Sequence, residues 1–148
     1  MTAFQIRPSH DGDGDSMLRV WSDAVDATHG FLSPQDRRDI EEQVAPYVHQ
    51  SGFLVAVDAG DEPIGFLGGT GSNIDSLFVA PANHGRGVGT RLIEAFASQC
   101  TGALTVDVNE QNRSGRIFYE RRGFRMVGRS DLDSEGRPYP LLHLRRPD

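Results

Sequence analysis

Hydrophobic and polar residues follow two different periods along this chain, and each change of period marks the boundary of a predicted element. In the first 50 residues, strict alternation over 4–7 predicts a short strand, and apolar residues at helical spacing predict a helix over 10–29. A second helix is expected to begin at Ser33-Pro34, because a serine side chain can cap a helix and proline fits its first turn. Pro46 should kink or end this helix.

After residue 50, short hydrophobic runs separated by turn residues predict most of the strands. These runs lie at 53–57, 64–67, 74–79, 103–108, 124–127 and 141–144. Two more helices are expected, one that starts near Val88 and is closed by Thr101-Gly102, and one over 111–122. The resulting order of strands and helices implies a mixed sheet with helices on both faces.

Composition fits one globular domain over residues 1–148. The chain is 37% hydrophobic and 24% charged, and it has no apolar run long enough for a membrane span or a signal peptide. Its single cysteine, Cys100, excludes an intrachain disulfide and a cysteine-built zinc site, and is expected to be a buried residue in the middle of a helix. We therefore expect a cytoplasmic protein.

Charge is distributed unevenly between the two halves of the chain. All 15 basic residues are arginine. Residues 1–75 contain 4 arginines against 13 acidic residues, whereas residues 76–148 contain 11 arginines against 8 acidic residues. One interpretation is an uneven solvated surface; the other is that the second half binds an anionic ligand and the first half a cationic one. A sequence pI near 5.3 disfavours a general nucleic-acid binder.

The acidic segment 11–15 is similar to the start of a calcium-binding loop. Such a loop needs glycine at its sixth position and glutamate at its twelfth, where this chain has Ser16 and Ser22. We therefore expect a solvated turn before the first helix, and no metal site.

The strongest candidate for a ligand site is the glycine-rich loop that follows the strand ending at Val79. It carries Gly85, Gly87 and Gly89 at alternate positions and opens directly into a helix. Glycines let the backbone approach a ligand, and the unpaired N–H groups at a helix N-terminus favour phosphate oxygens. The spacing differs from the dinucleotide fingerprint, and a chain without lysine cannot form a Walker motif. Tight packing of the turn is the alternative explanation.

A second candidate lies on the helix expected over 111–122. Asn112 stands where that helix begins, and Tyr119 lies about two turns further along, on nearly the same face. Gly115, between them, leaves room for a ligand against the helix. A tyrosine hydroxyl in such a place can protonate a leaving group, and core packing is the alternative role.

Together these two segments resemble the GNAT superfamily of acetyl-CoA-dependent acyltransferases. The loop 84–89, His-Gly-Arg-Gly-Val-Gly, is similar to the family's pyrophosphate loop Q/R-x-x-G-x-G/A, with histidine where glutamine or arginine is usual. The helix is similar to N-x-x-A-x-x-F-Y-x-K-x-G-F, with Gly115 for the alanine and Arg121 for the lysine. More narrowly, the segments 25–33, 108–112 and 128–142 resemble the YjaB-type branch of bacterial acetyltransferases.

The resemblance implies a fold and a cofactor site. The fold is α/β (α+β), with a mixed, mostly antiparallel central sheet of six to seven strands, flanked by about four helices and splayed next to the cofactor strand. Acetyl-CoA would place its pantetheine arm along that strand and its pyrophosphate in the glycine-rich loop. The implied cofactor-binding residues are Leu77, Phe78, Val79, His84, Gly85, Arg86, Gly87, Val88, Gly89, Thr90, Asn112, Ser114, Phe118, Tyr119 and Arg121.

The resemblance also implies direct attack of an amine on the thioester, without a covalent enzyme intermediate. Tyr119 would protonate the departing thiolate of coenzyme A, and the amide of Val79 or of a neighbouring residue would hold the oxyanion. Asp75 or Asp107 would take the proton of the ammonium substrate through water. His29 is a further candidate because an imidazole titrates near neutral pH, with a cap or packing role as the alternative.

The implied acceptor is a primary amine of either a protein or a small molecule. Thr28, His29 and Phe31 are expected to line its pocket, with Tyr139 as a further candidate. The acidic first half of the chain fits a cationic acceptor. The other interpretation is a regulatory or sensor module that binds acyl-CoA and catalyses nothing. We expect no nucleic-acid or membrane partner, and a monomer or homodimer.

Overall fold

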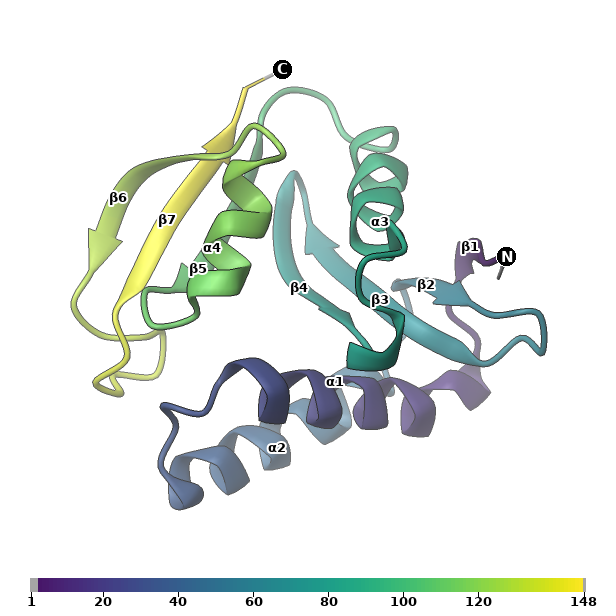
Figure 1. Cartoon of the computed structure of the whole chain (residues 1–148), viewed down its shortest axis with the longest axis horizontal. Helices are drawn as coiled ribbons and strands as arrows, with labels where there is room; N and C mark the ends of the chain where they lie inside the picture. The colour runs from purple at the N-terminus through teal and green to yellow at the C-terminus, as the bar shows by residue number, and fades with distance from the viewer. Residues whose placement is uncertain (1–2, 148) are drawn as a thin grey trace.

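One seven-stranded sheet divides the molecule into two layers of helices (Figure 1). The computed structural model describes residues 3–147. The strand order is β1-β2-β3-β4-β5-β7-β6; β4 and β5 are parallel, and the other neighbours are antiparallel. The strands are β1 (Gln5–Pro8), β2 (Leu54–Val57), β3 (Pro63–Thr70), β4 (Asn73–Val79), β5 (Leu104–Asn109), β6 (Arg125–Ser130) and β7 (Leu141–Arg146).

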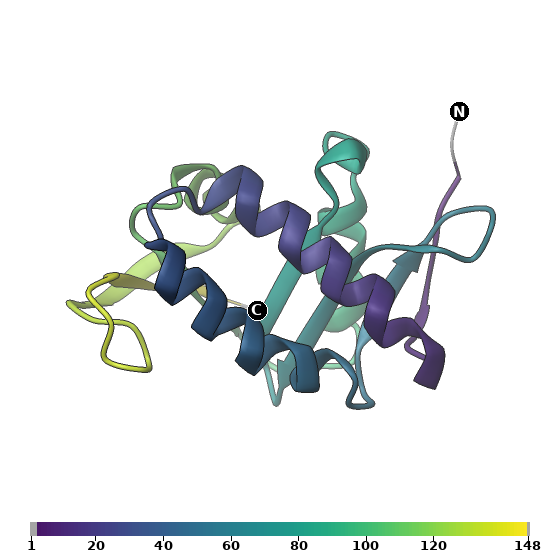
Figure 2. The ribbon, with the colours of Figure 1, turned by 90° about the horizontal axis from the view of Figure 1, so that it is seen from below.

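The part of the chain that the structure describes contains four α-helices, two on each face of the sheet. α1 (Gly14–Thr28) and α2 (Pro34–Val48) lie side by side on one face, and α3 (Val88–Ala97) and α4 (Arg113–Glu120) lie on the other (Figures 1 and 2). The expected fold class, a mixed and mostly antiparallel sheet between helices, is confirmed. Among the described residues, no helix combines the length and the apolar character needed to cross a membrane.

Alternation along the strands sends neighbouring side chains into two different hydrophobic cores. On β3, Phe66 packs in the core beneath α1 and α2, whereas Leu67 packs in the core beneath α3 and α4. Both side chains are almost completely buried, and burial of each contributes roughly 1.5–3 kcal/mol to stability. The same sheet therefore supports both layers of helices.

Two helices end differently from the sequence-based expectation. α3 stops at Ala97 rather than at Thr101-Gly102, so Cys100 lies in the following loop. It is half-buried there, with its Sγ atom 3.5 Å from the carbonyl oxygen of Gly71. The expectation of a buried cysteine in mid-helix is therefore wrong. α2 continues through Pro46 and ends two residues later, so this proline acts near the helix end.

The acidic segment 11–15 is more ordered than a solvated turn. It begins with a 3₁₀ turn, Asp11–Asp13, in which Asp13 keeps only 7% of its surface exposed. Arg7 on β1 donates from Nη1 to Asp13 Oδ2 at 2.8 Å, and the backbone N–H of His10 donates to the same oxygen at 2.7 Å. The expectation of a solvated turn is wrong for Asp13, because burial of this carboxylate is compensated by the Arg7 charge.

β4 and β5 separate soon after they meet. Within residues 3–147, two residue pairs join them, Asn73–Thr105 and Ile74–Val106. β4 continues to Val79 while still paired with β3 on its other side. A register shift at Gly68/Gly69 leaves Asp75 without an opposite residue on β3. The edge of β4 beyond the two pairs therefore presents backbone N–H and C=O groups that β5 does not satisfy.

Candidate active site

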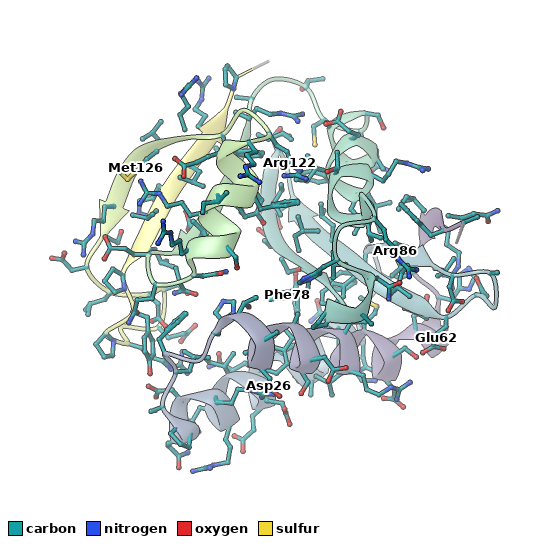
Figure 3. The ribbon with its side chains drawn as sticks, in the orientation of Figure 1. Asp26, Glu62, Phe78, Arg86, Arg122 and Met126 are labelled. Atoms are coloured by element: carbon teal, nitrogen blue, oxygen red, sulfur yellow. The ribbon has the colours of Figure 1, made fainter. Side chains whose placement is uncertain are left out.

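A cleft of about 1020 Å³ lies between β4 and β5, where the two strands diverge. Its walls come from the end of α1, from both strands, from the first turn of α3 and from α4. Figures 1 and 3 show how these elements are arranged in space. Most residues singled out in the sequence line it. They are Thr28, His29, Asp75, Leu77, Phe78, Val79, His84, Gly85, Gly87, Val88, Gly89, Thr90, Asp107, Asn112, Ser114, Phe118, Tyr119 and Arg121.

The glycine-rich loop places the N-terminus of α3 on the wall of this cleft. Gly85 and Gly87 both have φ of 79°, a left-handed conformation that favours glycine. Gly87 caps the helix, and the backbone N–H of Arg91 donates to its carbonyl oxygen at 3.0 Å. The preceding amides of the first turn have no intrahelical acceptor. Together with the helix dipole, they form a site suited to phosphate oxygens.

Gly89 has a different reason to be glycine. A Cβ atom there would lie 2.8 Å from the Phe118 ring, which is too close for real side chains. The first turn of α3 therefore packs directly against α4. Two different requirements thus explain the glycines of this loop. Gly85 and Gly87 are needed for their backbone conformation, and Gly89 is needed because the turn packs closely against Phe118.

Arg122 is a cleft residue that the sequence analysis missed. Its Nε donates to the Thr90 hydroxyl oxygen at 2.7 Å and its Nη1 donates to the Phe118 carbonyl oxygen at 2.8 Å. The guanidinium also lies 3.7 Å from the centre of the Phe118 ring. Burial lowers the pKa of Arg122, and the charge of Arg121 lowers it further. The four-residue spacing from Phe118 was the available signal.

His84 and Arg86, two of the predicted cofactor residues, are both hydrogen-bonded within the loop region. His84 lies at the cleft with Nε2 hydrogen-bonded to the Val79 carbonyl oxygen at 3.1 Å. Arg86 is exposed and does not line the cleft; its Nη1 donates to Asn83 Oδ1 at 3.4 Å (Figure 3). The side chains of His84 and Arg86 are thus engaged with the loop itself, whereas the backbone amides at the start of α3 have no intrahelical acceptor.

Tyr119 belongs to the core and to the cleft at once. Its ring packs edge-on against Phe118 and Phe124, with centroids 5.2 and 5.3 Å apart, and 7% of the residue is exposed. Within the described chain, no fully buried polar side-chain atom lacks a hydrogen-bond partner, and no residue is bonded to this hydroxyl. The hydroxyl therefore faces the cleft. Burial raises the pKa of Tyr119, so it carries its proton at neutral pH.

Asn112 caps α4, which changes the interpretation of Gly115. Asn112 Oδ1 accepts from the backbone N–H of Gly115 at 3.1 Å and from the Ser114 hydroxyl at 3.2 Å. A Cβ atom at Gly115 would lie 2.5 Å from Asn112 Nδ2. The capping side chain thus lies directly against Gly115, and both residues line the cleft, so the expected ligand position beside Gly115 stays a prediction. This cap also begins the helix at residue 113 instead of 111.

The two candidate carboxylates are held differently. Asp75 Oδ2 accepts from the Thr70 hydroxyl at 2.5 Å, and its Oδ1 accepts from Asn73 Nδ2 at 2.7 Å. Asp107 Oδ1 is hydrogen-bonded to His143 Nδ1 at 2.6 Å, and no described residue is bonded to its Oδ2. Both residues line the cleft, but Asp107 is the one with a free oxygen.

His29 forms the C-terminal cap of α1 at the other end of the cleft. The Thr28 hydroxyl donates to the Ala24 carbonyl oxygen at 2.8 Å and lies 2.7 Å from His29 Nδ1. Because the hydroxyl proton is already used, Nδ1 donates to Thr28 and the lone pair is on Nε2. Burial lowers the pKa of His29 to about 4, so the imidazole is neutral at pH 7.

Phe31 and Tyr139 lie behind His29 rather than on the cleft wall. The Phe31 ring lies 5.2 Å from His29 and 5.8 Å from Tyr139, between ring centroids. The Tyr139 hydroxyl accepts from the backbone N–H of Ser33 at 3.1 Å and donates to Asp36. The α1–α2 and β6–β7 loops are therefore joined behind His29.

Comparison with known proteins places this arrangement in one family. Residues 23–138 match the acetyltransferase (GNAT) domain. The chain is 42% identical over 141 residues to the peptidyl-lysine N-acetyltransferase YjaB of Salmonella typhimurium, which covers 95% of this chain and 97% of that protein. The solution structure of apo-form YjaB from Escherichia coli has a TM-score of 0.91 at 40% identity, over 97% of each chain.

A more distant structure shares the fold alone. The PaiA N-acetyltransferase of Thermoplasma acidophilum, solved in complex with coenzyme A, has a TM-score of 0.75 at 18% identity over 99% of each chain. The resemblance read from the loop and the tyrosine helix is confirmed by these matches. The chain belongs to the GNAT family, and it is an N-acetyltransferase that acts on amines.

Proposed function

We propose that this enzyme transfers the acetyl group of acetyl-CoA to lysine side chains of proteins, and that residues 1–148 act as a single cytoplasmic domain. The observation that carries the proposal is the divergence of β4 from β5 beside the α3 N-terminus, which combines an open strand edge with an anion site. The name of the Salmonella relative, a peptidyl-lysine N-acetyltransferase, supports lysine as the acceptor. Since this chain contains no lysine, it cannot acetylate lysine side chains of its own.

The pyrophosphate of acetyl-CoA would bind at the first turn of α3. The amides of Val88, Gly89 and Thr90 are free of intrahelical bonds and lie at the positive end of the helix dipole. Arg121 and Arg122, on the facing wall, add two positive charges. These groups fit an anion without help from a lysine or a metal.

The pantetheine arm would lie between β4 and α4. The edge of β4 over 77–79 offers unpaired backbone groups that match the amides of pantetheine in the manner of an added strand. Ser114 and Phe118 form the opposite wall, and the Nδ2 group of Asn112 stays available because the cap uses Oδ1. When bound, acetyl-CoA supplies a thioester that an amine can attack.

Tyr119 and Val79 would act on the reacting atoms. The buried Tyr119 hydroxyl faces the cleft with its proton in place, so it can protonate the thiolate as the carbon–sulfur bond breaks. A backbone N–H at or next to Val79 would hold the negative charge that develops on the carbonyl oxygen.

Asp107 is the better candidate for the carboxylate that meets the acceptor. Both oxygens of Asp75 already accept hydrogen bonds at the β3–β4 turn, whereas Oδ2 of Asp107 is free of described partners. Asp107 would bind the ammonium form of the amine and pass its proton to water. Thr28 and His29 would line the entrance opposite, and His29 stays neutral there because of its lowered pKa.

The test uses acetyl-CoA binding and peptide acetylation on the same preparation. Titration calorimetry should show saturable binding of acetyl-CoA and none of adenosine. A peptide with one lysine and a blocked N-terminus should release coenzyme A thiol, and the same peptide with arginine in place of lysine should not. Binding without release with any amine would identify a regulatory module instead. If no binding were seen at millimolar acetyl-CoA, the proposed acetyl-CoA site would be refuted.

A further inference from the structure

Three polar side chains on neighbouring strands form a continuous hydrogen-bonded chain behind the cleft. His143 Nδ1 on β7 lies 2.6 Å from Asp107 Oδ1 on β5, and His143 Nε2 lies 2.7 Å from Ser130 Oγ on β6. Asp107 lines both the cleft and a second hollow of about 460 Å³, which His143 and Ser130 also line. The Asp107 carboxylate is thus bonded on its far side to a group outside the cleft.

Strand register builds this chain. Asp107 and His143 are direct partners in the ladder between β5 and β7. On β6, a register shift after Met126 places Gly128 opposite His143. A Cβ atom at Gly128 would lie 3.3 Å from His143 Cδ2, tighter than an ordinary contact. The glycine therefore leaves room for the imidazole to lie over β6 and to reach Ser130.

The positions of the protons follow from the chemistry of the three groups. An ionised carboxylate has no proton to give, so the short contact with Asp107 requires a proton on His143 Nδ1. In the neutral imidazole, Nε2 is then an acceptor, and the Ser130 hydroxyl donates to it. Protonation of His143 turns Nε2 into a donor to Ser130 and places a positive charge next to Asp107.

We propose that His143 is a positioning residue for the acceptor amine. It fixes Asp107 through one oxygen, leaves Oδ2 for the ammonium group, and sets the net charge of the pair by its own protonation. With neutral His143 the pair is negative and attracts a cationic amine, whereas with protonated His143 the two charges cancel. This inference rests on the role proposed above for Asp107.

The other charged groups at the hollow that His143 lines are carboxylates and the arginines that pair with them. Carboxylates ordinarily titrate near pH 4, and the hollow contains Asp131 and Asp133 besides Asp107. Arg129 is bonded to Asp131 at 2.5 Å, and Arg137 lies 3.7 Å from Asp133. Imidazoles titrate within this window, and a lysine acceptor stays protonated throughout it. A change in acceptor affinity across the window would therefore report on an imidazole.

The experiment measures acceptor KM and kcat from pH 5.5 to 8 at saturating acetyl-CoA, with the N-terminally blocked lysine peptide. In the wild type, KM should rise by about fivefold or more as the pH falls. His143→Asn keeps an amide donor near Asp107 but cannot ionise, so its KM should stay constant across the range. His143→Leu removes the donor and should raise KM at every pH.

The matched control is His49→Asn. The His49 imidazole also contacts a carboxylate, with Nε2 at 2.9 Å from Asp15, but it lines neither the cleft nor the hollow. This variant should keep the wild-type profile. A His143→Asn enzyme with the same pH-dependent KM as the wild type would overturn the proposal.

Direct binding of the same peptide separates the two proposals. If no acetyl transfer occurred, the proposed function would fail, while peptide affinity at pH 6 and 8 would still decide the role of His143. NMR of the ¹⁵N-labelled protein gives a further readout. The hydrogen-bonded Nδ1 proton of His143 should resonate far downfield and should lose this shift in Asp107→Asn. A signal that is unaffected by Asp107→Asn would contradict the positioning role.

Discussion

Arg122 donates its Nε–H to the hydroxyl of Thr90 at 2.7 Å, which joins the end of α4 to the first turn of α3. The two helices lie on opposite walls of the cleft, and Gly89 lets Phe118 pack between them. Since Nη1 is used by the Phe118 carbonyl oxygen, Nη2 is the part of the guanidinium without a described partner. Arg122 thus combines a structural role with a positive charge on the cleft wall beside the α3 N-terminus.

Arg122→Leu should therefore weaken acetyl-CoA binding more than it slows transfer. Loss of a charged donor beside the pyrophosphate should raise the Kd by about 5- to 30-fold, equivalent to about 1–2 kcal/mol. Turnover at saturating acetyl-CoA should change less than threefold. Calorimetry and steady-state kinetics measure the two effects. Arg116→Ala is the control, because Arg116 pairs with Glu120 on the same helix outside the cleft; an equal loss in both variants would refute the assignment.

Tyr119→Phe should lower kcat by about 100-fold and leave the Kd for acetyl-CoA unchanged. The ring keeps its contacts with Phe118 and Phe124, and only the proton donor is lost. Burial raises the pKa of Tyr119, so the wild-type profile should show no loss of activity from tyrosine ionisation below pH 10. Stopped-assay kinetics with the lysine peptide measure kcat. A variant as fast as the wild type would remove Tyr119 from the chemistry.

The glycines of the α3 loop should respond differently to alanine. Gly89→Ala brings a methyl group within 2.8 Å of Phe118 and should destabilise the fold by about 1–3 kcal/mol. Gly87→Ala meets no neighbour but forces alanine to a φ of 79°, at a cost of about 1–2 kcal/mol. Thermal unfolding measures both. Gly12→Ala, with open space and no positive φ, should stay within about 0.5 kcal/mol of the wild type.

Asp13 should make stability depend on pH in the acid range. The hydrogen bond from Arg7 lowers the pKa of Asp13 below its ordinary value, so this contribution is complete above about pH 4 and is lost as the pH falls through the folded-state pKa. Asp13→Asn should cost about 1–3 kcal/mol at pH 7 and progressively less below pH 4. Urea unfolding at pH 7 and pH 3 measures the difference.

The control for Asp13 is the second carboxylate that Arg7 contacts. Asp61 lies 3.0 Å from Arg7 Nε, but its side chain is 66% exposed. Asp61→Asn should cost less than about 1 kcal/mol at pH 7. Equal losses in the two variants would show that burial of Asp13 does not matter.

Local sequence patterns predicted the elements of this fold, and most of the residues singled out in the sequence line its cleft. The order of strands and helices follows from periodicity and capping, which depend on nearby residues, whereas the roles expected for the loop 84–89 and for Tyr119 came from the family resemblance. Arg122 and the contact of Asp107 with His143 could not be predicted in this way. The Arg122 contact depends on how α3 and α4 pack, and the Asp107–His143 contact depends on the register of β5 and β7; both involve segments that are distant in the sequence.

Asn112 and Gly115 show that a local pattern can also be read in two ways. Their spacing indicated a ligand against the helix, but the same spacing places a capping amide over the backbone of residue 115. A pattern of three residues cannot distinguish a space filled by a ligand from a space filled by a neighbouring side chain. In the structure the capping amide lies against Gly115, and both residues line the cleft.

The short ladder between β4 and β5 also has a mechanical consequence. Two residue pairs connect the strands β1–β4 to the strands β5–β7 within the described sheet, so the sheet bends most easily at this line. A donor molecule bound between β4 and β5 would contact both strands and would restrict this bending of the sheet. Amide hydrogen exchange at residues 104–106 should then become slower when the acetyl donor binds. The donor would thus supply the sheet with stiffness at this line, in addition to the group that is transferred.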